Sequence, residues 1–90
     1  MEYSFGPEKD AINKERHGLS LAFGAQIFED EKHLILPTIR HEDGEDRYKI
    51  IGMVGEKLFT AVFVWRDDIP RFISVRRSNN GEEKSYRSPL

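Results

Sequence analysis

The sequence predicts a single α+β domain with two N-terminal helices on one face of an antiparallel β-sheet and a short C-terminal helix. Helix signals are confined to about the first 28 residues and to the C-terminal end, and strand-like segments fill the stretch between them. The chain has 90 residues, which supports one domain, residues 1–90, with one modest core. We therefore expect any site to be a surface groove rather than a large internal cavity.

The first helix is predicted over residues 7–17, after a short edge strand at residues 3–5. Pro7 suits the first helical position, where its missing N–H costs nothing. Gly18 suits the left-handed residue that ends many helices. Because the segment has few apolar side chains, it should lie on the surface.

A second helix is predicted over residues 21–28, with Ser20 as its N-cap. Its apolar residues recur at helical spacing, which predicts that one face is buried. Those residues are Leu21, Ala25 and Phe28. The acidic run at 29–31 is expected to be solvated surface.

Four strand-like segments follow, at residues 33–39, 46–53, 57–66 and 70–76. The first should end near Pro37 and lead into a polar loop at residues 40–45. A tight connection at 54–56 and a turn at 67–68 join the later strands. Residues 82–87 are expected to form the C-terminal helix, capped by residues 79–81 and ended by Pro89.

Strand alternation predicts a group of polar side chains on one face of the sheet. If Tyr48, Ile50, Ile73 and Val75 face the helices, then alternate residues face away. The residues that face away are Arg47, Lys49, Phe72, Ser74 and Arg76, and all of them except Phe72 are polar. Arginines on such a face could hold a phosphate, and ordinary sheet-surface charge is the alternative.

The segment at 57–66 is apolar on both faces, and the two N-terminal helices can cover only one of them. The C-terminal helix, a second copy or another protein must therefore cover the other face. Because the C-terminal tail is short, we expect a partner protein to cover part of it.

Composition constrains the class of partner and the compartment. The net charge is −2, which argues mildly against nucleic acid, but residues 66–90 carry six basic and four acidic groups. There is no cysteine, which excludes disulfides and suits a reducing cytosol. The N-terminus lacks signal-peptide features, and the apolar run at 58–65 is too short to cross a membrane. A cytoplasmic protein is expected.

The sequence contains neither a phosphate-binding glycine loop nor a nucleophile elbow, and its histidines lack metal-ligand spacing. No metal or cofactor is therefore expected. The residues that remain are bases, acids and cations, and RNA cleavage is a reaction that needs little else. It requires neither a metal nor a cofactor, because the substrate carries its own nucleophile, the 2′-OH. The protein must then move protons and stabilise charge on the phosphate, which histidine, arginine, lysine, glutamate and tyrosine can do.

Four blocks of sequence, in order along nearly the whole chain, resemble the BrnT family of bacterial toxins. They are residues 13–20; Ala25, Phe28 and Asp30; residues 44–47 with Ile51 and Gly52; and residues 73–77 with Glu83 and Tyr86. The chain departs from the family at Phe5-Gly6, where a Trp-Asp pair is usual, and at Val75, where alanine is usual.

The resemblance implies a RelE-like ribonuclease toxin that inhibits translation and is neutralised by a BrnA-like antitoxin. It further implies a toxin–antitoxin heterotetramer that contacts operator DNA only through the antitoxin. Arg47 and Arg76 are expected to hold the scissile phosphate, and His17 to transfer a proton. A second set of candidates comprises Lys9, Glu45, Arg77 and Tyr86, with Glu45 able to orient Arg47.

Two other functions fit the same residues. One is a non-catalytic module that binds RNA or protein on the same fold. The other is an inactive toxin that still binds its antitoxin. Growth arrest by the lone chain would separate an active toxin from both.

Overall fold

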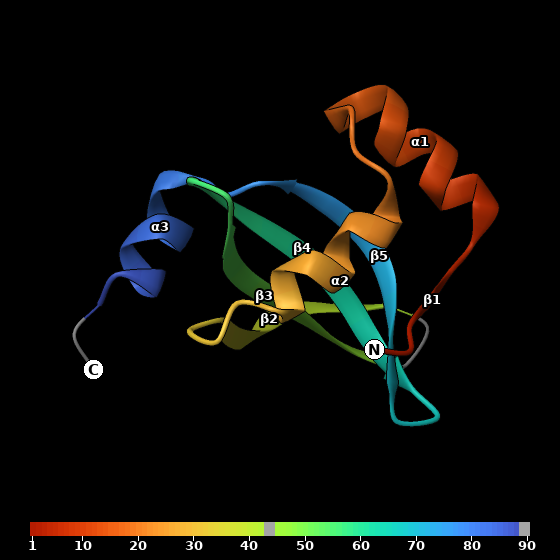
Figure 1. The fold of residues 1–90 in the computed structure, drawn as a ribbon. Helices are drawn as coiled ribbons and strands as arrows, with labels where there is room; N and C mark the ends of the chain where they lie inside the picture. The colour runs from red at the N-terminus through yellow and green to blue at the C-terminus, as the bar shows by residue number, and fades with distance from the viewer. Residues whose placement is uncertain (43–44, 89–90) are drawn as a thin grey trace.

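The computed structural model describes residues 1–42 and 45–88, with the side chains of residues 39–42 excepted. The elements, in chain order (Figure 1), are β1 (Ser4–Phe5), α1 (Pro7–His17), the 3-10 turn η1 (Leu21–Phe23), α2 (Gly24–Phe28), β2 (Leu34–Glu42), β3 (Glu45–Val54), β4 (Lys57–Arg66), β5 (Ile69–Arg77) and α3 (Asn80–Tyr86). The predicted α+β class is confirmed. Pro89, the expected end of α3, lies outside the described residues.

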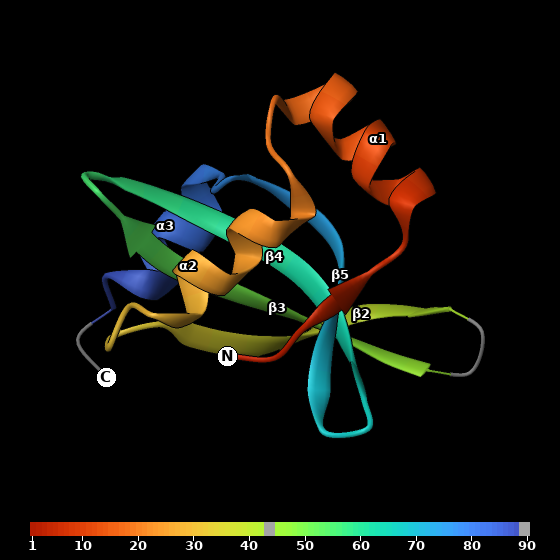
Figure 2. The ribbon, with the colours of Figure 1, turned by 45° about the vertical axis from the view of Figure 1, so that its right-hand side comes forward.

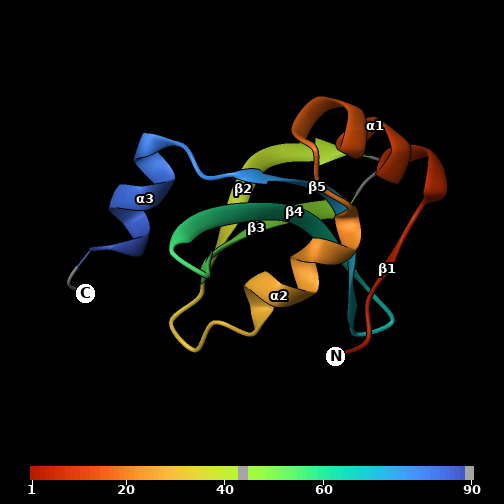
Figure 3. The same ribbon diagram turned by 45° about the horizontal axis from the view of Figure 1, so that its top comes forward.

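The five strands form one sheet in the order β1-β5-β4-β3-β2. Strands β2 to β5 pair antiparallel, as predicted, while β1 pairs parallel with β5 at the sheet edge. Helix α2 crosses one face of the sheet, and α1 lies beside the β5 edge (Figures 1 and 3). Helix α3 lies at the far end of the sheet from α1 (Figure 2).

The core fills the space between the sheet and the η1–α2 segment. Its buried residues are Leu21, Ile27, Ile50, Phe59, Ala61, Phe63, Phe72 and Val75. Helix α2 approaches the sheet closely because Gly24 has no side chain: a Cβ there would lie 2.5 Å from the Phe72 ring. Ile27 is buried more deeply than the predicted Ala25, because the 3-10 first turn has about three residues per turn and shifts the buried face.

Local signals mark three helix ends at or within two residues of their predicted positions. Gly18 ends α1 with a φ of 69°, in the left-handed region. The Ser20 hydroxyl accepts a hydrogen bond from the backbone N–H of Ala22 at the start of η1. Asn79 and Glu82 form a reciprocal capping box, which starts α3 two residues earlier than predicted.

Asn13 joins α1 to the edge of the sheet. Strand β1 pairs with β5 only at Arg71 and Phe72, so the edge further along β5 needs another partner. The Asn13 Oδ1 atom accepts a hydrogen bond from Val75 N (3.0 Å), and its Nδ2 atom donates to Val75 O (2.8 Å) and Leu19 O (2.8 Å). The buried amide thus pairs with β5 as a residue of a neighbouring strand would.

Strands β2 and β3 are longer than predicted. Strand β2 continues through Pro37 to Glu42, and β3 begins at Glu45, so most of the expected 40–45 loop is strand. Pro37 is tolerated because β2 is an edge strand, where one N–H can be missing from the sheet. The register shifts between Pro37 and His41.

A β-bulge at Ile73 corrects the predicted alternation along β5. Ser74 pairs with Val62, whereas Phe72 pairs with the next residue of β4, Phe63, so Ile73 is the extra residue. Phe72 and Val75 are therefore both buried in the helix-covered core, and the prediction that Phe72 faces away is wrong. Ile73 is half-buried beside α1 rather than packed in the core.

The second face of β4 is largely covered by the chain itself. Leu58, Thr60 and Val64 on this face are at most 4% exposed. Helix α3 lies over it through Glu82, which contacts Thr60. The chain itself therefore buries these three residues, while Val62 between them is half-buried, and the expectation that a partner covers part of this face stays a prediction.

The prediction that the acidic run at 29–31 is solvated is wrong for Asp30. Its carboxylate accepts hydrogen bonds from the backbone N–H groups of Met53 (2.8 Å) and Lys32 (3.0 Å) and from the Tyr86 hydroxyl (2.5 Å). These bonds lower the pKa of Asp30 although partial burial opposes its ionisation. Asp30 therefore ties the end of α2 to both β3 and α3.

We predict that Asn13→Ala lowers the free energy of unfolding by about 3 kcal/mol, because it leaves buried backbone groups of Val75 without partners. Urea unfolding measures this change. Glu15→Ala, an exposed neighbour on α1, is the control and should change stability by less than about 0.5 kcal/mol. Equal stability of the two variants would contradict the proposed role of Asn13.

Candidate active-site groove

A groove runs along α1 on the face of the sheet opposite α2. It consists of two adjoining hollows of about 310 and 300 Å³, which share Lys9, Arg47 and Ile73. We call the first the Arg71 pocket and the second the His17 pocket. Each is at the lower end of the size range of small-ligand sites.

The His17 pocket lies between α1 and the middle of the sheet. Its lining residues are Lys9, Ile12, Asn13, Arg16, His17, Arg47, Ile73 and Ser74. Lys9, Asn13 and His17 are four residues apart on α1 and so share one helix face. Because Asn13 binds the edge of β5, Lys9 and His17 are turned toward the same hollow.

Arg47 reaches the groove from β3, across from α1. It is half-buried and lines both hollows. Four of the seven predicted site residues therefore line the groove: Lys9, His17, Glu45 and Arg47. They come from two segments that are 28 to 38 residues apart in sequence, and the packing of α1 beside the sheet brings them together.

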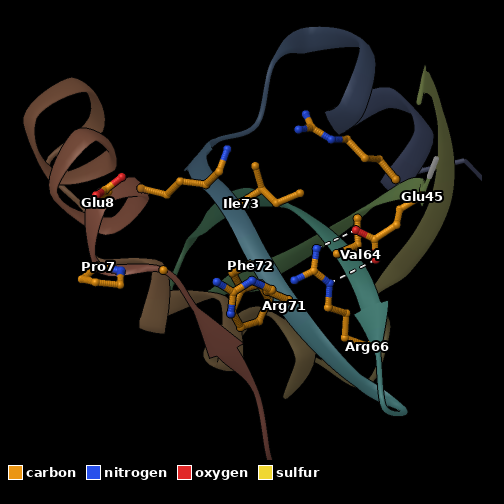
Figure 4. A pocket seen from close by; sticks show the side chains of 11 residues that line it. Pro7, Glu8, Glu45, Val64, Arg66, Arg71, Phe72 and Ile73 are labelled. Atoms are coloured by element: carbon orange, nitrogen blue, oxygen red, sulfur yellow. Dashed lines mark hydrogen bonds and ion pairs between the residues drawn. The ribbon is translucent and has the colours of Figure 1, made fainter. Parts of the chain in front are cut away.

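The Arg71 pocket lies at the N-terminal end of α1 (Figure 4). Its remaining lining residues are Gly6, Pro7, Glu8, Glu45, Val64, Arg66, Arg71 and Phe72. The Glu45 carboxylate accepts two hydrogen bonds from Arg66, from Nε at 3.1 Å and Nη2 at 2.6 Å. Arg66 thereby lowers the pKa of Glu45, so Glu45 is a weak base held by an arginine.

Arg76 lies on the same face of the sheet but belongs to a different cluster. Its guanidinium binds Glu82 through two hydrogen bonds of 2.7 and 2.8 Å. Lys49 and Thr60 donate to the same carboxylate, which is only 2% exposed. Burial raises the pKa of Glu82, but these hydrogen bonds outweigh it and lower the value to about 2.

Arg77 and Tyr86 do not line either hollow of the groove. The Arg77 guanidinium lies 5.5 Å from the centre of the Phe59 ring, a cation–π contact that packs the end of β5. The Tyr86 hydroxyl donates to Asp30, and burial together with this bond raises the Tyr86 pKa to about 12. Both side chains therefore have structural partners at the α3 end of the molecule.

The structure also reveals groove residues that are not among the seven predicted site residues. Arg66 and Arg71 are two of the basic residues of the C-terminal third, but nothing local distinguishes them from surface charge. The sequence could have indicated that Asn13 lies near the site, because it is midway between Lys9 and His17 at helical spacing.

Two general findings concern only the residues that the structure describes. Among them, no three histidine, aspartate or glutamate side chains are grouped closely enough to hold a metal ion. No helix in this part of the chain is long and apolar enough to cross a membrane.

A small α+β domain whose surface groove is lined by lysine, arginine and histidine has a site suited to a phosphodiester. The family model of the BrnT ribonuclease toxins of type II toxin–antitoxin systems matches residues 5–82, which include all the groove residues. The chain therefore belongs to the BrnT family, as the sequence blocks indicate. No curated protein matches it.

We predict that Glu82→Gln lowers stability at neutral pH by about 3 kcal/mol, and that this deficit disappears in acid. The folded-state pKa of Glu82 is depressed from 4.5 to about 2, so its stabilising effect is complete above pH 4.5 and is lost as pH falls toward 2. Chemical unfolding of both proteins between pH 7 and 2 measures the difference. Glu83→Gln is the control and should run parallel to the wild type.

Proposed function

We propose that this toxin cleaves RNA in the groove without a metal ion, using the substrate 2′-OH as the nucleophile. The observation that carries this proposal is the convergence of Lys9, His17 and Arg47 on one hollow from opposite sides. Together these residues offer a proton-exchanging imidazole and two cations beside a space that fits a phosphate.

The chemistry assigns a separate task to each group. Arg47 holds the scissile phosphate, and Lys9 stabilises the additional negative charge on the phosphorane. The 2′ oxygen loses its proton, forms a bond to phosphorus and displaces the 5′ oxygen, which takes up a proton. The products are a 2′,3′-cyclic phosphate and a 5′-hydroxyl end. His17 exchanges a proton in this reaction, from its place in the last turn of α1.

The remaining predicted residues support the site in this proposal. Glu45 orients Arg66, with which it forms the ion pair seen in the structure. Arg76 neutralises the buried Glu82 and so holds α3 on the sheet. Arg77 and Tyr86 stabilise the same end through Phe59 and Asp30.

A type II toxin implies an antitoxin protein as partner. We propose that this partner is BrnA-like, basic and largely helical, that it forms a heterotetramer with the toxin, and that it alone contacts operator DNA. Residues 1–65 carry twelve acidic and eight basic groups, which complements a basic partner. Cleavage of cytoplasmic RNA by the unneutralised toxin would inhibit translation and arrest growth.

We predict that Arg47→Ala and His17→Ala each reduce the rate of cleavage of a defined RNA about a hundredfold, by removing about 3 kcal/mol of transition-state stabilisation. Initial rates measured on purified, folded variants test this. Arg87→Ala is the control and should cleave at the wild-type rate, because Arg87 is the exposed C-cap residue of α3 and lines neither hollow. If both groove variants cleave within a few-fold of wild type, the assignment is wrong.

Cleavage should also survive EDTA, because the 2′-OH supplies the nucleophile and the groove supplies the charge. The measurement is the rate of cleavage before and after exhaustive chelation. Loss of activity, with recovery on adding a divalent ion, would contradict the mechanism. RNA binding without cleavage in either condition would instead support a non-catalytic module.

A further inference from the structure

The Arg71 pocket continues the groove beyond the residues assigned to the cleavage step. Helix α1 has 11 residues and is therefore about 16 Å long, with His17 at its end and the Arg71 pocket at its beginning. Lys9 and Arg47 lie where the two hollows join. An RNA strand that places its scissile phosphate at this junction would extend into the Arg71 pocket.

Charge in this pocket favours an anion. Four cationic side chains line it (Lys9, Arg47, Arg66 and Arg71) against two acidic ones, Glu8 and Glu45, which leaves two positive charges in excess. Arg66 is bonded to Glu45 and, together with the charge of Arg71 in the same pocket, lowers the Glu45 pKa. A phosphate is a bidentate acceptor like that carboxylate and suits the same guanidinium groups.

Arg71 is positioned by the backbone at the β1–α1 junction. Its Nη1 atom donates to the Ser4 hydroxyl at 3.4 Å. A Cβ at Gly6 would lie only 3.2 Å from its Nη2 atom, so the absence of a side chain at Gly6 provides space for the guanidinium. The cation is therefore held at the pocket by its surroundings rather than extended into solvent.

Besides its cationic side chains, the Arg71 pocket has an apolar wall. Pro7, Val64 and Ile73 line the same hollow, and the close-up shows Arg71 and Ile73 on β5 between Pro7 on one side and Glu45 on the other (Figure 4). A nucleotide combines an anionic phosphate with a base that has apolar faces. A pocket with both kinds of lining, and a volume of about 310 Å³, matches that combination.

We propose that the Arg71 pocket is a nucleotide subsite, in which Arg66 and Arg71 bind the RNA phosphate next to the one that is cleaved. This inference rests on the proposed function of the groove. Because the subsite binds a non-reacting part of the substrate, it contributes to affinity and not to the chemical step. Loss of its arginines therefore raises KM for a long RNA and leaves kcat unchanged.

Binding and cleavage test the subsite separately. The binding probe is a fluorescent hexanucleotide with 2′-deoxy residues, which cannot be cleaved. Arg71→Ala should weaken its binding about tenfold and reduce the slope of log affinity against log salt by about one. Arg71→Lys keeps the charge but loses bidentate contact, so its affinity should be intermediate. Arg87→Ala is the control and should bind as wild type.

Cleavage compares an RNA hexanucleotide with a dinucleotide that lacks the neighbouring phosphate. Arg71→Ala and Arg66→Ala should raise KM for the hexanucleotide and leave dinucleotide cleavage unchanged. Equal losses on both substrates, or hexanucleotide binding equal to the control, would overturn the subsite. If wild type cleaves RNA while Arg71→Ala binds normally, only the subsite fails. If wild type does not cleave but Arg71→Ala weakens binding, the subsite stands and the proposed catalysis fails.

Discussion

The pairing of the Asn13 amide with the backbone of Val75 is the interaction on which the groove depends. Its hydrogen bonds join the middle of α1 to the edge of β5 and to the segment that follows α1. The amide satisfies a donor and an acceptor at the edge of β5, beyond the point where β1 stops pairing. Because both groups are buried, their hydrogen bonds are costly to break. The same contact turns Lys9 and His17, one helical turn away on either side, toward Arg47.

On the face of the sheet opposite α2, two carboxylates bind different sets of cations. At one end, buried Glu82 binds Arg76 and Lys49, so the cations there stabilise the position of α3. At the other end, Glu45 binds Arg66, while the pocket as a whole keeps an excess of positive charge. Arginines on one face of the sheet thus have different carboxylate partners at its two ends.

The bulge at Ile73 connects the core with the groove. By adding one residue to β5, it allows Phe72 and Val75 to be buried on the same face while Ser74 and Arg76 remain on the other. Ile73 is thereby placed beside α1, where it lines both hollows. A strand without this irregularity would place Phe72 and Val75 on opposite faces, so that one of them would leave the core.

The sequence by itself determined the features that depend on neighbouring residues. Gly18, Ser20 and Asn79 mark helix ends because caps act within a few residues, and the alternation in residues 57–66 predicts β4. The ordered blocks also indicated the BrnT family. Only the tertiary structure decided that Asp30 is bonded rather than solvated, that β5 contains a bulge, and that Arg76 binds Glu82 whereas Arg66 and Arg71 line the groove. These features depend on the alignment of strands and helices far apart in sequence, and no local pattern encodes which distant carboxylate an arginine will meet.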